Sequence, residues 1–240
     1  MIYSEKVVIV TGASRGVGLQ IAKHFLANGA LVIGLSRGNP NIESENYFHY
    51  KVNISDGNDI VRCFRQDISK KFKKIDILIN NAAVLTSQYS MILPIQNAIE
   101  MVNVNLLGVF FVSREAAKLM RQCDSGRIIN IGSMASSLKP IGDSIYAASK
   151  AGVITLASVM SKEFSSYKIT CNTVAITAIE TDMLNQHTPS ARIKIKEIIE
   201  KLPVPRMANI DDILNVIDFF ASERSSYITS QLIYLGGIDV

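Results

Sequence analysis

A tyrosine and a lysine four residues apart, Tyr146 and Lys150, carry side chains suited to proton transfer. Residues at this spacing lie on one face of a helix, so the ammonium can lie beside the phenol ring, where a positive charge lowers the pKa of a tyrosine. Ser133, thirteen residues upstream, could donate a hydrogen bond to the same substrate oxygen. The pattern predicts a site that moves a proton to or from an oxygen. The alternative is a helix that packs the ring in the core and extends the lysine to water.

A glycine-rich turn follows the first apolar run, Lys6–Val10, and precedes a helical pattern. Its glycines are Gly12, Gly16 and Gly18. Glycines let the backbone approach a pyrophosphate, and the helix N-terminus presents free N–H groups and a positive dipole to it. The spacing, G-x-x-x-G-x-G, differs from the commoner G-x-G-x-x-G fingerprint. The glycine-rich turn predicts a dinucleotide-binding site. The alternative is a strand-to-helix connection that binds no ligand.

Short apolar runs alternate with helical stretches along the chain, which predicts parallel β-α units. Seven runs are expected to be strands: Val7–Val10, Leu31–Leu35, Tyr47–Val52, Ile75–Ile79, Arg127–Ile131, Ile169–Ala175 and Leu232–Leu235. Right-handed crossovers place helices on both faces and gather ligands at the carboxyl ends of the strands. The predicted fold is α/β, a single doubly wound Rossmann-type domain over residues 1–240 with a seven-stranded parallel sheet.

Composition favours a compact enzyme with a substantial core, since 48% of the 240 residues are hydrophobic and 19% are charged. The formal charge is +4, and the one dense basic run is Lys70–Lys74. This run lies where a helix should end, and cations there complement the helix dipole. We therefore expect no nucleic-acid or membrane partner, although the run is the feature that could touch either.

The cysteines and histidines form no ligand pattern. Cys63, Cys123 and Cys171 are odd in number and far apart, so neither a disulfide framework nor a metal site is expected. No secretory signal is apparent, and no apolar stretch approaches the roughly 18 residues of a membrane span. The expected location is the cytoplasm.

Five motifs resemble, in the same order, those of the short-chain dehydrogenase/reductase superfamily. They are Thr11-Gly12-x-x-x-Gly16-x-Gly18, Asn80-Asn81-Ala82-Ala83, Asn105, Ser133 and Tyr146-x-x-x-Lys150. The chain is most similar to the single-domain bacterial type that includes the carrier-protein-linked β-ketoacyl reductases. The resemblance implies reduction of a ketone to a secondary alcohol with NADPH, or the reverse oxidation.

The resemblance also implies a role for each catalytic residue. Tyr146 protonates the developing alkoxide, Ser133 hydrogen-bonds it, and both contact the substrate. Lys150 keeps Tyr146 acidic and grips the nicotinamide ribose, and Asn105 holds a water that links Lys150 to solvent. A purely structural amide is the alternative for Asn105, because a buried amide needs hydrogen-bond partners in any case.

NADP(H) is expected in preference to NAD(H). The second strand ends in Ser36-Arg37, where an acidic residue would bind the ribose hydroxyls and an arginine instead favours a 2′-phosphate. Arg15 could supply a second guanidinium, unless both arginines are solvated. The predicted cofactor contacts are Gly12, Ser14, Arg15, Gly16, Val17, Gly18, Arg37, Asn53, Ile54, Asn81, Ala82, Tyr146, Lys150, Ile179 and Thr181.

The chain departs from the family pattern after the sixth strand. Ile176-Thr177 replaces Pro-Gly, which changes backbone freedom at the base of a predicted substrate lid around residues 178–205. Asn53 replaces the usual Asp near the adenine. Near the C-terminus, Ser230 and Leu235 replace a Gly and an Asp, which bears on oligomer contacts.

The substrate is left open as a small carbonyl or alcohol compound, free or linked to a carrier protein. Arg192, Lys194 and Lys196 could anchor an anionic group, or could form the wet face of an amphipathic helix. In relatives, the two long helices near 96–121 and 146–164 form the pairing surface, so a homodimer or homotetramer is expected. The alternative function is a catalytically silent NADP(H)-binding regulatory or partner protein. A sugar-nucleotide dehydratase or epimerase is a third possibility, but it belongs to longer chains.

Overall fold

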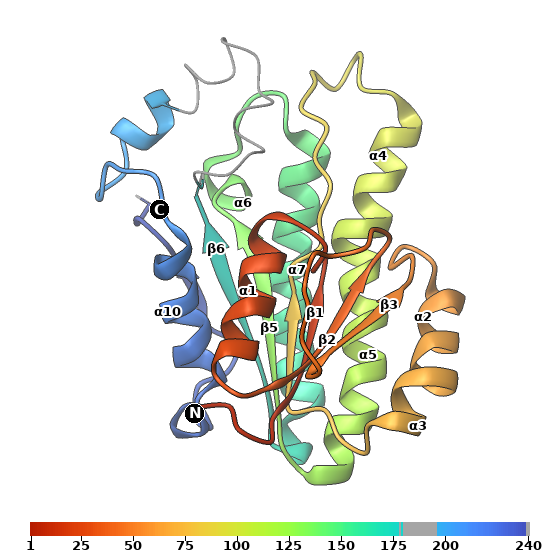
Figure 1. Ribbon diagram of the computed structural model, residues 1–240. Coiled ribbons are helices and arrows are strands. Elements are labelled where there is room, and N and C mark those ends of the chain that lie inside the picture. Colours follow the sequence, from red (N-terminus) through yellow and green to blue (C-terminus); the bar gives the residue numbers. More distant parts are fainter. Residues whose placement is uncertain (178, 180–195, 239–240) are drawn as a thin grey trace.

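The computed structural model describes residues 1–177, 179 and 196–238, and it contains one parallel sheet with helices on both faces (Figure 1). The strands are β1 (Val7–Thr11), β2 (Leu31–Ser36), β3 (Tyr47–Lys51), β4 (Ile77–Asn80), β5 (Gly126–Ser133), β6 (Ile169–Ile176) and β7 (Leu232–Tyr234). Their order in the sheet is β3-β2-β1-β4-β5-β6-β7, and every pairing is parallel. The predicted seven-stranded doubly wound sheet is confirmed.

Helices connect the strands. They are α1 (Gly16–Ala27), α2 (Gly57–Cys63), α3 (Ser69–Lys71), α4 (Ile95–Val102), α5 (Gly108–Met120), α6 (Ala135–Leu138), α7 (Ser144–Glu163) and α10 (Ile210–Ala221), with a further helical segment at 196–200. π-helical turns occur at η1 (Phe64–Ile68) and η2 (Asn103–Leu107), and 3₁₀ turns occur at η3 (Arg121–Cys123), η4 (Ser165–Tyr167) and η5 (Glu223–Ser225).

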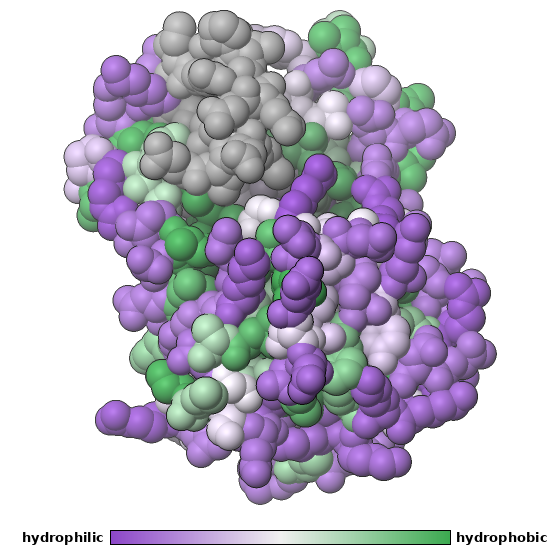
Figure 2. Space-filling view, in the orientation of Figure 1, coloured by the Kyte–Doolittle hydropathy of each residue, from purple (hydrophilic) through white to green (hydrophobic). Residues whose placement is uncertain are grey.

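The sheet is buried on both sides because alternate strand residues face two separate cores. Val7 and Ile9 of β1 belong to the core beneath α2, α5 and α7, whereas Val8 and Val10 belong to the core beneath α1 and α10. All four side chains are buried. This double burial explains why the strands read as continuous apolar runs rather than alternating ones. Hydrophilic side chains cover most of the face shown in Figure 2.

The sheet order reverses beside β1, since the chain continues outward through β2 and β3 and then returns to β4 on the other side of β1. A crevice at the carboxyl ends of the strands is expected at such a reversal. The glycine-rich turn after β1 and the Asn-Asn pair at the end of β4 both lie at this edge. The topology therefore brings together motifs that are about 70 residues apart in the chain.

The basic run Lys70–Lys74 begins inside α3, which ends at Lys71. The Lys71 ammonium lies 3.7 Å from the centroid of the Phe48 ring, and Lys74 pairs with Asp76 at 3.3 Å. Both cations therefore have partners within the protein.

Candidate active site

The turn between β1 and α1 is fixed to the end of β4 by Thr11. Its hydroxyl accepts hydrogen bonds from the backbone N–H groups of Asn81 and Ala82, both at 3.0 Å. The Asn81 side-chain amide donates to the Thr11 carbonyl oxygen at 3.0 Å. Thr11 was quoted in the predicted motif without a role, and the structure shows that it joins two of the motifs.

The glycines of this turn leave room at its centre. Gly12 and Gly16 have φ angles of 69° and 57°, in the left-handed region that favours glycine. A Cβ at Gly16 would meet no atom within 4 Å, whereas a Cβ at Gly18 would collide with the Gly12 carbonyl oxygen and the Asn81 amide. Gly18 thus permits close packing, and Gly16 faces open space where a ligand can approach.

The start of α1 suits a phosphate group. Arg15 precedes the helix in an extended conformation and gives it no side-chain cap, and the first turn contains no acidic residue. Free N–H groups and the positive end of the helix dipole therefore face the opening above Gly16, Val17 and Gly18. The observed residues fit the pyrophosphate of a dinucleotide.

Arg37 extends from the end of β2 toward solvent, with 67% of its side chain exposed. Its guanidinium lies 3.7 Å from the carboxylate of Glu100 on α4. The turn is held by the Ser36 hydroxyl, which donates to the Gly38 carbonyl oxygen at 2.8 Å. A Cβ at Gly38 would lie 3.4 Å from the Ser14 hydroxyl, so the β2 turn and the glycine-rich turn are neighbours.

Asn53 and Ile54 lie in the turn between β3 and α2. The Asn53 side-chain oxygen accepts bonds from the backbone and hydroxyl of Ser55, so it organises the turn itself. Ile54 is 8% exposed and packs in the core. Its carbonyl lies 3.1 Å from a Cβ built at Gly108, which places the turn against the start of α5.

Tyr146, Lys150 and Ser133 meet where α7 passes the end of β5. The Lys150 ammonium lies 5.9 Å from the centroid of the Tyr146 ring and donates to the Ile131 carbonyl oxygen at 2.8 Å. The Ser133 hydroxyl interacts with the Tyr146 phenol, and it also accepts a bond from the Ala135 N–H at 3.2 Å. The predicted juxtaposition of phenol, ammonium and hydroxyl is present.

Burial sets the charge state of both groups. Burial raises the pKa of the Tyr146 phenol, the hydrogen bond from Ser133 opposes the rise, and the charge of Asp143 adds to it. Burial also lowers the pKa of the Lys150 ammonium to about 8. The net direction of the Tyr146 shift is upward, and burial is its largest cause. That Lys150 lowers the pKa of Tyr146 stays a prediction.

Asn105 is fully buried in the π-helical turn η2. Its side-chain oxygen accepts from the Val84 N–H at 2.8 Å, and its amide donates to the Val84 carbonyl oxygen at 2.9 Å and to the Ser149 hydroxyl at 3.3 Å. Ser149 in turn donates to the Tyr146 carbonyl oxygen at 2.7 Å. The amide thus ties the loop after β4 to the turn of α7 that carries Tyr146.

Asn80 connects three elements beneath the site. Its amide donates to the Ser113 hydroxyl and to the Asn130 side-chain oxygen, both at 2.9 Å, and so joins β4, α5 and β5 beneath the site.

Only part of the predicted lid lies within the described residues. Ile179 forms an isolated bridge with Ala208 and is 9% exposed, so it is held near the sheet. Thr181, Arg192 and Lys194 lie outside the described residues. Lys196 pairs with Glu200 at 3.8 Å.

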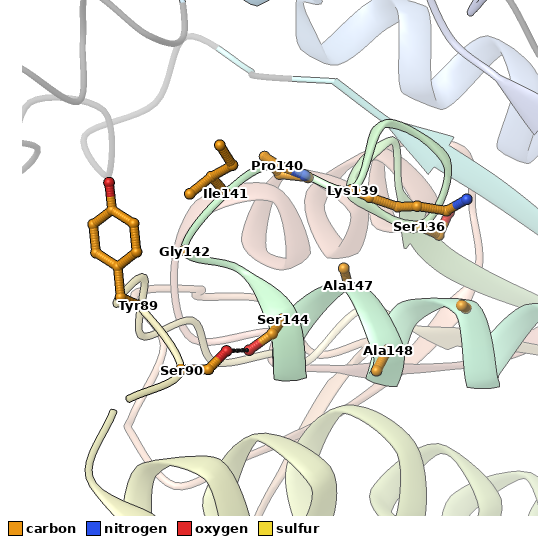
Figure 3. A pocket seen from close by; sticks show the side chains of 11 residues that line it. Tyr89, Ser90, Ser136, Lys139, Pro140, Ile141, Gly142, Ser144, Ala147 and Ala148 are labelled. Carbon is orange, nitrogen blue, oxygen red and sulfur yellow. Dashed lines mark hydrogen bonds between the residues drawn. The ribbon is translucent and has the colours of Figure 1, made fainter. Parts of the chain in front are cut away.

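A cavity of about 500 Å³ lies beside α7 (Figure 3). Its lining comes from the segments that follow β4 and β5 and from small residues of α7: Tyr89, Ser90, Ser136, Lys139, Pro140, Ile141, Gly142, Ser144, Ala147, Ala148 and Ala151. Tyr146 and Lys150 are not in this lining. The cavity therefore adjoins the helix that carries the site without containing the phenol.

Asp143 directly precedes α7, and its charge acts to raise the pKa of the Tyr146 phenol.

Comparison with known proteins places the chain in a class. Residues 6–192 match the sequence model of the short chain dehydrogenase family. The chain belongs to this family of oxidoreductases, whose members bind a nicotinamide cofactor.

Within the family, the chain is similar to bacterial 3-oxoacyl-acyl-carrier-protein reductases. The chain is 33% identical over 243 residues to the 3-oxoacyl-acyl-carrier-protein reductase FabG of Salmonella typhimurium, covering 99% of this chain and 98% of the relative. The corresponding Chlamydia pneumoniae protein is 32% identical, covering 97% and 96%.

Solved structures agree on the fold. The ligand-free aldohexose dehydrogenase of Thermoplasma acidophilum has a TM-score of 0.88 and 28% identity, covering 98% of this chain and 94% of the other. A short chain dehydrogenase from Leptospira borgpetersenii with bound NAD+ also has a TM-score of 0.88, at 26% identity and with coverage of 99% and 94%.

Proposed function

We propose that this protein reduces a ketone to a secondary alcohol with NADPH, or catalyses the reverse oxidation. The observation that carries the proposal is the meeting of the Ser133 hydroxyl, the Tyr146 phenol and the Lys150 ammonium at the carboxyl end of the sheet. The similarity to carrier-protein reductases supports a ketone substrate and leaves a carrier-linked one open.

A nicotinamide cofactor, when bound, would supply the hydride for the carbonyl carbon. Tyr146 donates its phenolic proton to the oxygen as negative charge develops there, and Ser133 donates a hydrogen bond to the same oxygen. A tyrosine phenol is protonated at neutral pH at its ordinary pKa of about 10, and burial raises the pKa of Tyr146 further, so the proton that reduction requires is present. Lys150 stabilises the phenolate left after proton transfer, and Asn105 positions the loop and helix around it.

NADPH is the proposed cofactor because Arg37 offers an exposed guanidinium at the end of β2, close to Ser14 and the glycine-rich turn. The ion pair with Glu100 does not sequester this group, since an exposed pair contributes only about 0–1 kcal/mol. A 2′-phosphate, with two negative charges, competes with it favourably.

The proposal is tested by replacing the proton donor. We expect wild-type protein to oxidise NADPH with a panel of ketones, and Tyr146→Phe to lower kcat by about 10²–10⁴-fold, the usual contribution of a general acid. NADPH fluorescence should give similar dissociation constants for both proteins. Binding of NADPH without turnover by any ketone would instead support the catalytically silent alternative, and equal turnover by both proteins would exclude Tyr146 as the donor.

A further inference from the structure

The cavity beside α7 adjoins the residues proposed to act on the carbonyl group. The hydroxyl of Ser136, which lines the cavity, donates to the Ser133 carbonyl oxygen at 2.7 Å. Ala147, also in the lining, directly follows Tyr146 on α7. The volume of about 500 Å³ is that of a small-molecule site. A ketone bound at Ser133 and Tyr146 can therefore extend the rest of its structure into this cavity.

Lys139 is the one charged residue among the described residues that line the cavity. The serine hydroxyls of the lining have partners within the protein: those of Ser90 and Ser144 bond to each other at 2.9 Å, and that of Ser136 donates to the backbone. The remaining lining is largely apolar. A cleft with charge of one sign attracts ligands of the opposite sign, so this cavity favours an anion.

The Lys139 ammonium is available to such a ligand. Within residues 1–177, 179 and 196–238, no carboxylate forms an ion pair with it. The residue is exposed, and Figure 3 shows its side chain and Ser136 toward one end of the cavity, with Tyr89 at the other. An anion bound here would not have to displace a carboxylate of the described chain.

The backbone holds Lys139 in a conformation that favours glycine. Lys139 ends the short helix α6 with φ and ψ of 49° and 57°, in the left-handed region. Glycine adopts this conformation without strain and is the usual residue where a helix ends in this way. Side chains held in such conformations cluster at ligand sites. The lysine side chain is therefore present at this position at a cost that glycine would avoid.

We propose that Lys139 binds a carboxylate at the far end of the ketone substrate. This inference rests on the proposed reductase function and names its substrate class, oxo acids in which several carbon atoms separate the carboxylate from the carbonyl. A single ammonium matches a singly charged carboxylate better than a doubly charged phosphate, which needs several donors. The apolar lining, with Pro140 and Ala147, suits the methylene groups between the two ends.

The test compares 5-oxohexanoate with 5-oxohexanamide, which carries a neutral group of nearly the same size in place of the carboxylate, as substrates with NADPH. For wild-type protein we expect kcat/KM to be about tenfold higher for the oxo acid, the effect of one hydrogen bond to a charged group. In Lys139→Met this ratio falls toward one, and in Lys139→Arg it is retained. High salt should lower the ratio for wild-type protein, because it screens the ion pair.

Lys168→Met is the matched control and retains the wild-type ratio. Lys168 also has a positive φ, 54°, but it lies before the amino end of β6 and pairs with Asp124. Lys139→Gly removes the side chain and suits the left-handed backbone, so this variant should fold and should also lose the preference. Circular dichroism and urea unfolding establish that each variant is folded.

The outcomes separate the two claims. If wild-type protein reduces the oxo acid and the amide with equal kcat/KM, or if Lys139→Met keeps the preference, the inference about Lys139 is wrong while the reductase function is retained. A preference for 2-oxohexanoate over 5-oxohexanoate would likewise overturn it, because that carboxylate lies beside the carbonyl. If no ketone consumes NADPH, the proposed function fails and the inference fails with it.

Discussion

At the scale of single residues, the Lys150 ammonium lies beside the Tyr146 ring, and burying its charge lowers the stability of the folded protein. The ammonium is 3% exposed and has one hydrogen-bond acceptor, Ile131. Burial lowers its pKa from 10.5 to about 8, which means that the folded protein binds this proton less tightly than the unfolded chain does.

The sign of this shift gives a prediction for stability. Below pH 8 Lys150 is charged in both the folded and the unfolded protein, so the full cost of burying its charge is present. Between pH 8 and 10.5 the unfolded chain binds more protons than the folded protein, so the free energy of unfolding increases as the pH rises. We expect the stability of Lys150→Met relative to wild type to be greatest below pH 8 and to decline by about 3 kcal/mol by pH 10.5. Urea unfolding of both proteins at a series of pH values measures the difference. A difference that does not change with pH would contradict the buried charge.

Arg37 gives a prediction about the cofactor. Removing the guanidinium should weaken binding of NADPH and leave NADH nearly unaffected, because only NADPH carries the 2′-phosphate. We expect Arg37→Gln to raise the dissociation constant of NADPH about tenfold, as for one charged hydrogen bond. Fluorescence titration with each cofactor checks this. A wild-type preference for NADH would contradict the assignment of Arg37 without affecting the catalytic residues.

At the scale of elements, the turn after β1 depends on packing that its glycines alone permit. A methyl group at Gly18 would collide with the Gly12 carbonyl oxygen and the Asn81 amide, whereas one at Gly16 would face open space. The two glycines therefore serve different purposes, close contact at Gly18 and positive φ at Gly16.

We expect Gly18→Ala to destabilise the protein by about 2–3 kcal/mol, as overpacking of a rigid contact does. Gly16→Ala is the matched control, with a cost of only about 1 kcal/mol from the left-handed backbone. Thermal or urea unfolding of both variants tests the ranking. Equal losses of stability would show that the contact with Asn81 relaxes easily.

The π-helical turn η2 is the element that presents Asn105. It interrupts the long helical run between α4 and α5, and turns of this kind often occur at functional sites. The amide points inward, where it accepts a hydrogen bond from the Val84 N–H and donates one to the Val84 carbonyl oxygen. These hydrogen bonds explain how the buried Asn105 amide is satisfied within the fold. Holding a water that links Lys150 to solvent, the role that the family resemblance implies, would be a second role of Asn105.

At the scale of the whole molecule, one stripe of apolar residues stays exposed. Ile95, Ile99, Leu107 and Phe110 lie along the run from α4 to α5 and are 77%, 46%, 39% and 38% exposed. The run Ile95–Cys123 is also long and apolar enough to span a membrane by length and composition alone, although no apolar stretch of that length was expected. Its other face packs beside the sheet, as in a core helix.

The stripe fits the pairing surface expected from the family, so we expect the protein to be a dimer or tetramer that buries it. Phe110→Glu places a charge in this surface and should shift the protein to a smaller species, measured by light scattering after gel filtration. Ile2→Glu, at an apolar residue near the N-terminus that is 76% exposed, should leave the mass unchanged. A monomeric wild-type protein would contradict the expectation.

The sequence alone determined the sheet, and it predicted the residues of the candidate site. Parallel strands that are buried on both faces require apolar runs such as Val7–Val10, and tight turns require glycines. Both features can therefore be recognised in the amino-acid sequence. Tyr146 and Lys150 could be paired from helical spacing because they lie on one element.

Only the tertiary structure decided how the environment acts on these residues. Burial raises the pKa of Tyr146 and Ser133, which lies on a different element, lowers it, so neither effect could be inferred from the local Tyr146–Lys150 spacing. The unpaired oxygen of Asp143, the Arg37–Glu100 ion pair and the bonds from Thr11 to the end of β4 depend on three-dimensional packing. Desolvation and hydrogen-bond satisfaction are sums over all neighbours in space, and neither can be read from spacing along the chain.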